Sequence, residues 1–153
     1  MQNRLADIIK VKGRLKLTVR NPDGSIAQFQ EVDNLVVTAG RAVLANGLWN
    51  PSADVRVSHI ELGSGTNAPA NGDTALQTAV YRNALASGNN VDNVATLTGF
   101  FNQTETSGTY REAGMFINGN GSLGTGTLLS RVAINITKSS IQTLTIEWEI
   151  TFS

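Results

Sequence analysis

The sequence predicts a mainly β protein: an antiparallel β-sandwich of about seven or eight strands, one short α-helix at about 38–47 and an N-terminal arm. Two observations predict this class. From Thr143 to Phe152 apolar and polar residues alternate without a break, which places every apolar side chain on one face of an extended strand. The 15 glycines against 3 prolines, with many Asn, Thr and Ser residues, are typical of strands joined by numerous turns.

The length and composition favour one domain. A chain of 153 residues, 41% of them hydrophobic, is long enough to bury a sizeable core. We therefore expect an arm at 1–12 and a single β-sandwich domain at 13–153. The chain has no cysteine, which excludes disulfides, thiolate nucleophiles and zinc–sulfur sites.

The charge and hydropathy patterns exclude two classes of partner. Acidic and basic residues balance at 12 each, so no overall field attracts a polyanion, and we expect no nucleic-acid partner. No apolar run approaches the roughly 18 to 20 residues that span a bilayer, and the first residues lack the apolar middle of a secretory signal. We expect no membrane partner, and synthesis in a cytoplasm.

The first residues carry apolar side chains at helical spacing. Leu5, Ile8 and Ile9 share one face of a helix, and a helix shorter than about 12 residues needs a surface to lie on. That surface is either the domain itself or a neighbouring subunit. Leu5, Ile8 and Ile9, together with Trp49, form the predicted contact surface.

A hairpin and the helix come next. Residues 14–20 alternate as a strand, a Pro-Asp-Gly turn follows, and 25–32 returns. Thr38 is a plausible N-cap and Gly47 a left-handed stop for the helix between them. The residues expected to face the sheet are Ala39, Ala42, Val43 and Leu48.

The middle of the chain is harder to assign. Residues 55–62 read as a strand, and 63–71 are too poor in apolar groups for any element. Residues 75–85 fit either a short helix or an irregular crossing, and 87–93 read as a polar loop. Three further strands are expected at 94–101, 110–117 and 127–136. The residues expected to define the core are Ile60, Leu62, Gly114, Phe116, Leu144, Ile146, Trp148 and Ile150.

No motif indicates an enzyme, a metal or a cofactor. His59 is the single imidazole, and no Gly-x-Ser-x-Gly elbow marks a nucleophile. The stretch Gly63-Ser64-Gly65-Thr66 lacks the Gly-Lys-Ser/Thr of a phosphate loop. Acidic residues in the polar loops lack the spacing of an EF-hand, and Glu147 and Glu149 share the solvent side of a strand. A hydrolase would need a carboxylate or His59 in a cleft.

A second function class is open at this point. In a carbohydrate-binding β-sandwich, Trp49, Tyr81 or Tyr110 would stack on a sugar ring. Aromatic residues make up only 6% of the chain, and most of them fit core positions. Loss of glycan binding on Trp49→Ala would support this class.

Several stretches, taken in order and spacing, resemble a family of small structural proteins of tailed bacteriophages, including head decoration or cement proteins and tail, collar or fibre-attachment modules. The stretches are Asn34-Leu35-Val36 with Ala39-Gly40, Glu61-Leu62-Gly63-Ser64-Gly65-Thr66 with Ala68-Pro69, Asp73-Thr74-Ala75-Leu76 with Tyr81-Arg82, Arg111-Glu112-Ala113-Gly114-Met115-Phe116, Leu128-Leu129-Ser130-Arg131-Val132, Lys138, and Leu144-Thr145-Ile146-Glu147-Trp148-Glu149-Ile150.

The resemblance implies a virion building block without catalytic residues that assembles as a homotrimer or other ring. Its partners would be copies of itself and other virion proteins, such as the major capsid protein or a tail protein. It would be made in the cytoplasm of a bacterial host. We expect a head decoration protein, with a small tail, collar, baseplate or fibre-attachment protein as the alternative. The sequence ends at Ser153 without a repetitive shaft, unlike fibre proteins.

Overall fold

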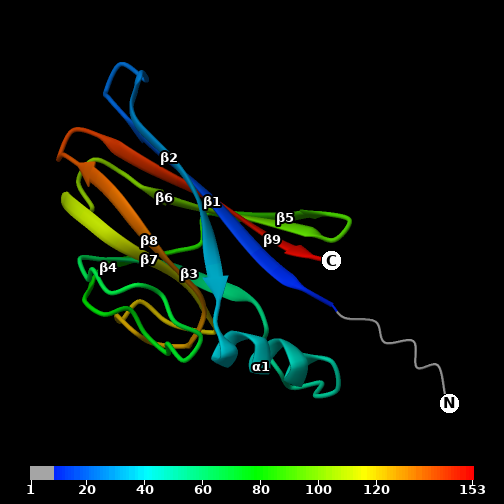
Figure 1. Ribbon diagram of the computed structural model, residues 1–153. Helices are drawn as coiled ribbons and strands as arrows, with labels where there is room; N and C mark the ends of the chain where they lie inside the picture. The colour runs from blue at the N-terminus through cyan, green and yellow to red at the C-terminus, as the bar shows by residue number, and fades with distance from the viewer. Residues whose placement is uncertain (1–8) are drawn as a thin grey trace, which may run out of the picture.

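The computed structural model describes residues 9–153, and in this range it contains nine strands and one helix (Figure 1). The elements in chain order are β1 (Val11–Arg20), β2 (Ile26–Val36), α1 (Thr38–Gly47), β3 (Val57–Gly63), β4 (Ala79–Ala84), β5 (Ser87–Val91), β6 (Val94–Phe101), β7 (Gly108–Ile117), β8 (Thr127–Lys138) and β9 (Thr143–Phe152). The predicted arm, apart from Ile9 and the residues that follow it, lies outside the described residues.

All nine strands belong to one antiparallel sheet in the order β4-β3-β7-β8-β2-β1-β9-β6-β5. The sheet curls into a half-barrel (Figure 1). The prediction of a mainly β, antiparallel protein with one short helix is confirmed. The expected pair of separate sheets is replaced by a single continuous sheet, because β2 pairs with β1 on one side and with β8 on the other.

The two halves of the sheet separate along the β2–β8 border. Backbone pairing between these strands is limited to Leu35 and Val36. Farther along, glutamine side chains of β2 replace the missing backbone partners. Gln30 accepts a hydrogen bond from the amide of Asn135 at 3.0 Å, and Gln28 accepts one from the amide of Thr137 at 3.1 Å. The twist of the strands therefore opens the sheet without leaving these polar groups unpaired.

The core lies on the concave face of the curl. Strand β9 lies between β1 and β6 and contributes alternate side chains to the core, as its pattern predicts. The residues expected to define the core are buried: Ile60, Leu62, Gly114, Phe116, Leu144, Ile146, Trp148 and Ile150. Gly114 and Phe116 are not part of the main core, because they lie on the opposite face of β7. There Phe116 packs with Val37 and Leu128 in a second apolar cluster.

Helix α1 occupies the predicted range, but its ends differ from the expectation. Val37 is the N-cap and Thr38 is already helical, with no side-chain cap bond. Gly47 does not adopt a positive φ, and Leu48, expected to face the sheet, is 90% exposed. Of the other residues expected to face the sheet, Ala39 and Val43 pack against the core clusters and Ala42 is exposed. Gly40, the buried residue of the helix, contacts β8.

Replacing Gly40 with alanine is expected to destabilise the protein by about 1–3 kcal/mol, because the added methyl overpacks a backbone contact. A Cβ at this position would lie 2.6 Å from the Cα of Leu129 and 2.7 Å from its carbonyl oxygen. In an open helix the same change would stabilise by up to about 1 kcal/mol. Urea unfolding measures the effect. Gly72→Ala is the control, since a Cβ there meets nothing within 4 Å. Equal or greater stability of Gly40→Ala would contradict this packing.

Two strands were not predicted. Residues 79–84 form strand β4 where a helix or irregular crossing was expected, and residues 87–91 form strand β5 where a loop was expected. Strand β5 is exposed along its whole length, so it has no alternating pattern to detect. Both strands lie at the edges of the sheet, where burial imposes the weakest requirement on sequence.

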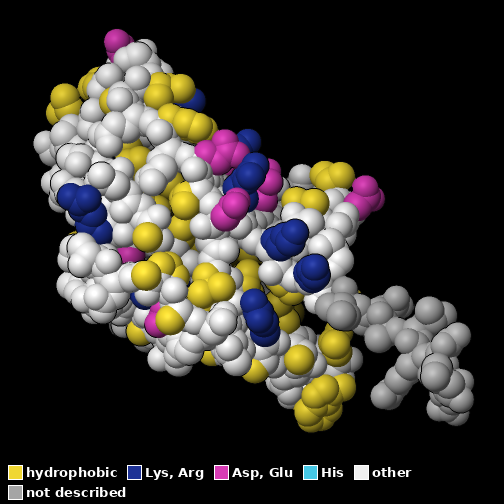
Figure 2. All heavy atoms as spheres, viewed as in Figure 1, with side chains coloured by type: hydrophobic (Ala, Val, Ile, Leu, Met, Phe, Trp, Pro, Cys, Tyr) yellow, Lys and Arg dark blue, Asp and Glu magenta, His cyan; other side chains and the backbone are white. Residues whose placement is uncertain are grey.

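The outer surface of β1 and β2 carries charges of both signs (Figure 2). Arg14 contacts Glu31 at 3.0 Å and Asp33 at 3.2 Å. These side chains are well exposed to water, so each ion pair contributes little to the stability of the fold. This face is typical of a solvated surface. Within the described range, no helix has the length and apolar character required to cross a membrane.

Candidate functional site

Four charged side chains are buried on the face of β3, β4, β7 and β8 opposite the core. Glu61 lies between Ile60 and Leu62, so it points away from the core while its neighbours point into it. Surface loops cover this face, which explains why its charges are shielded from water. Burying a charge is costly unless it is paired or hydrogen-bonded. The four are Glu61, Arg82, Glu112 and Arg131, and a fifth buried charge, Lys138, lies at the end of β8 on the side of Ile134 and Ile136.

Arg82 on β4 binds the loop at 118–126. Its guanidinium lies 3.3 Å from the carboxylate of Glu61 and 4.6 Å from the centre of the Phe116 ring. It donates hydrogen bonds to the carbonyl oxygens of Ser122 and Thr125, the latter at 3.1 and 3.2 Å. Glu61 accepts a hydrogen bond from the amide of Gly124 at 2.9 Å. The ion pair thus holds the loop by both its carbonyl and its amide groups.

Arg131 on β8 binds the loop at 64–78. Its guanidinium lies 2.7 Å from Asp73 and 3.0 Å from Glu112, and it donates to the carbonyl oxygen of Asn67 at 3.0 Å. The carboxylate of Glu112 also accepts a hydrogen bond from the amide of Thr78 at 3.1 Å. Burial opposes ionisation of Asp73, but the Ala70 amide and Arg131 lower its pKa overall. The carboxylate is therefore charged and paired at neutral pH.

Lys138, at the end of β8, binds a third loop at 102–107. Its ammonium donates to the carbonyl oxygens of Thr106 at 2.6 Å, Gln103 at 3.4 Å and Ser139 at 3.3 Å. Burial lowers the pKa of this lysine, and Glu105 opposes the shift. The three carbonyl oxygens replace the water that the ammonium loses on burial.

We call this set of five residues and Asp73 the charged layer. Each of its three cations binds carbonyl oxygens of one surface loop. Its members are spread along the chain from Glu61 to Lys138. The layer therefore fixes the conformation of three loops, and with it the shape of the surface that the loops present.

Glu61 gives the charged layer a pH dependence. Burial raises the pKa of this carboxyl above its ordinary 4.5, with the Gly124 amide and Arg82 opposing the rise. The folded protein therefore holds a proton here more tightly than the unfolded chain. Between pH 4.5 and the raised pKa, the stability contributed by Glu61 decreases as pH rises.

We expect the unfolding free energy of wild type, minus that of Glu61→Gln, to decrease as the pH rises from 4.5 through the raised pKa of Glu61, because the amide cannot titrate. Denaturant unfolding at a series of pH values measures the difference. The exposed Glu147→Gln serves as the control for loss of a carboxylate from a strand. Parallel profiles for wild type and Glu61→Gln would show that Glu61 does not titrate abnormally.

The residues considered for catalysis are not brought together. The Nδ1 atom of His59 lies 2.9 Å from the Ser58 hydroxyl, and burial and the charge of Arg82 lower the pKa of this imidazole. Glu147 lies on the solvent side of β9, as expected. Within residues 9–153, no three His, Cys, Asp or Glu side chains are grouped so as to hold a metal ion.

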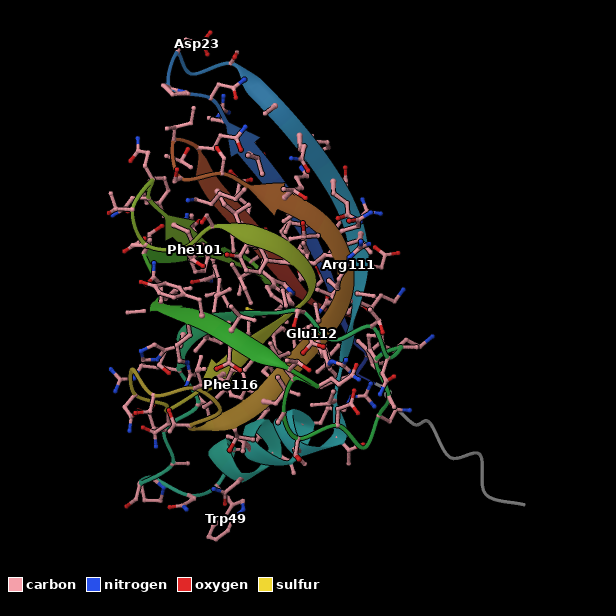
Figure 3. All side chains as sticks on the ribbon, turned by 90° about the vertical axis from the view of Figure 1, so that its left-hand side faces the viewer. Asp23, Trp49, Phe101, Arg111, Glu112 and Phe116 are labelled. Carbon is pink, nitrogen blue, oxygen red and sulfur yellow. The ribbon has the colours of Figure 1, made fainter. Side chains whose placement is uncertain are left out.

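The aromatic residues considered for sugar binding also separate. Tyr110 is buried and hydrogen-bonds Thr106, while Tyr81 is partly buried and packs edge-on against Phe101, with ring centres 6.1 Å apart. Trp49 is 77% exposed and projects beyond α1 at one end of the molecule (Figure 3). The three rings do not form a common platform.

The predicted contact surface is described only in part. Ile9 is 74% exposed and Trp49 is exposed beside Leu48, whereas Leu5 and Ile8 lie outside the described residues. Sequence reasoning misses the charged layer as a unit, because adjacent charges such as Arg111 and Glu112 are typical of ordinary ion pairs on a strand surface. Arg111 is exposed, while Glu112 is buried and bound to Arg131. A usable signal was Glu61, a charge inside an apolar strand.

Comparison with protein-family models, curated proteins and solved structures finds no match for this chain.

Proposed function

We propose that the protein is a non-enzymatic structural component of a tailed-phage virion, and specifically a head decoration or cement protein that stabilises the capsid. One observation carries the proposal. The separate stretches that resemble phage structural proteins supply every member of the charged layer, so residues spread along the chain serve one structural purpose. That purpose is to hold surface loops in a fixed shape.

Fixed loops suit a protein whose role is to contact neighbours. Ordering a loop during association costs conformational entropy, and a loop that is already held avoids most of this cost. Exposed apolar residues provide contact area at one end, where Leu48 and Trp49 project. Tryptophan is among the residues enriched in the energetically dominant part of interfaces.

The proposed partners are copies of the same chain, in a homotrimer or other ring, and the major capsid protein. Synthesis takes place in the cytoplasm of the bacterial host, and the virion is the final location. Sedimentation equilibrium of the purified protein tests self-assembly. A monomer at every concentration would contradict the homo-oligomer.

Antibodies raised against the purified protein test the virion role directly. Gold-labelled antibody is expected to decorate the heads of virions produced by the genome that encodes the chain. Labelling confined to tails would identify the alternative, a tail, collar, baseplate or fibre-attachment protein. Unlabelled virions, with the protein left in the soluble lysate, would contradict a structural role. Virions without the gene are the control.

A further inference from the structure

An apolar groove lies beside α1, at the end of the sheet where β9 finishes. Its volume is about 480 Å³. We call it the apolar groove and define it by Leu44, Val55, Leu85, Leu97, Ile150 and Phe152. Arg56 is the one charged residue that lines it. Apolar surface of this kind marks a site of contact with another apolar group.

The N-terminal arm leaves the described fold at the edge of this groove. The amide of Ser153 donates a hydrogen bond to the carbonyl oxygen of Lys10 at 2.9 Å. Val11, the next residue, lies opposite Phe152, which lines the groove. The arm and the groove are therefore neighbours, and the eight residues before Ile9 extend at most about 26–29 Å.

The arm has the apolar side chains that such a groove accommodates. Leu5 and Ile8 lie outside the described residues, and their spacing places them on one face of a helix. Aliphatic side chains gain free energy in proportion to the area that they remove from water. The groove offers aliphatic and aromatic surface and almost no charge.

The sequence at the base of the arm does not favour a tight turn back to its own groove. To fold back, the chain would have to reverse between Ile8 and Lys12, and this segment contains no Gly, Pro, Asn or Asp to form a tight turn. Its β-branched residues favour an extended backbone instead. This composition favours the groove of another molecule as the partner of the arm.

We infer that the arm of one molecule binds the apolar groove of a second copy, with Leu5 and Ile8 as the inserted side chains. This inference rests on the proposed self-assembly and names the segment and the groove that carry it. Repeated around a ring, the exchange gives each molecule one donated arm and one filled groove. Contacts of this head-to-tail kind close into rings when the rotation between copies permits.

Disulfide trapping tests the exchange, because the chain contains no cysteine of its own. Ile8→Cys is placed in one chain, which carries a mass tag, and Val55→Cys in an untagged chain. Val55 is 38% exposed, so its thiol remains accessible. Mild oxidation of the mixture is expected to give the tagged–untagged dimer. The control replaces Val55→Cys with Asp23→Cys, at the opposite end of the molecule (Figure 3).

A yield no greater than that of the control overturns the exchange. So does a double variant, Ile8→Cys with Val55→Cys, that forms its disulfide within a single chain on dilution. Either result assigns the arm to another surface or to its own groove.

A second measurement separates the exchange from self-assembly. Deleting residues 1–8 is expected to weaken self-association by at least about 100-fold, because two aliphatic side chains lose their burial, and to leave thermal unfolding of the separated chain unchanged. An oligomer that survives the deletion overturns the exchange but leaves self-assembly intact. A wild-type protein that is monomeric throughout overturns both.

Discussion

Replacing Arg131 with alanine is expected to lower the free energy of unfolding by about 3–5 kcal/mol, because it leaves a buried carboxylate without its partner. Glu112 and Arg131 are both almost fully buried, with their charged atoms 3.0 Å apart. Asp73, at 2.7 Å, loses the same partner. Guanidinium chloride unfolding followed by circular dichroism measures the loss.

The same variant is expected to release the loop at 64–78. The guanidinium of Arg131 donates a hydrogen bond to the carbonyl oxygen of Asn67. Without this bond the loop opens more often, so protease cleavage within it should become faster. Arg111→Ala is the matched control, because Arg111 is an exposed arginine on the neighbouring strand, and we expect a change within about 0.5 kcal/mol. A loss below about 1 kcal/mol in Arg131→Ala would show that the charged layer is not a structural requirement.

Trp148→Ala is expected to destabilise the protein by about 3–5 kcal/mol, because it removes the largest fully buried side chain of the core and leaves a cavity. Trp148 lies on an interior strand of the sheet, opposite Leu15 on β1 and Leu97 on β6. Among the described residues its indole nitrogen has no hydrogen-bond partner. Trp148→Phe removes no hydrogen bond and is therefore expected to lose less than the alanine variant.

The second tryptophan provides the control for this prediction. Trp49 is exposed, so Trp49→Ala is expected to change the unfolding free energy by no more than about 0.5 kcal/mol. Because the chain has 2 tryptophans, Trp49→Phe also isolates the fluorescence of Trp148 as a probe of core unfolding. Equal losses for Trp148→Ala and Trp49→Ala would mean that the position of Trp148 in the core is wrong.

The sequence predicted those elements in which one face is buried and the other wet. The alternation of apolar and polar residues predicted β9, and an alanine-rich segment followed by glycine predicted α1. Strand β5 carries no such contrast, since all its residues are exposed, and it forms by pairing with β6. The joining of the halves into one sheet depends on a two-residue pairing between β2 and β8, which no local pattern reveals.

The candidate site was less predictable than the fold. A charge in a strand gives the same local pattern whether it faces water or a covering loop. Glu61 and Glu149 both follow an apolar residue in a strand, yet Glu61 is buried beneath a loop and Glu149 is not. The difference arises from the loops, whose positions depend on partners far away in the chain. Periodicity reports which face a residue occupies and says nothing about what covers that face.

The interior position of β9 has a consequence for synthesis on the ribosome. Strand β9 follows both β1 and β6 in the chain and inserts between them, so both await a partner until Thr143–Phe152 emerges. A nascent chain that stops earlier exposes two unpaired strand edges and lacks Trp148, and such edges promote aggregation. Prematurely terminated chains are therefore poor competitors for assembly, because they cannot complete the sheet that positions the contact surfaces.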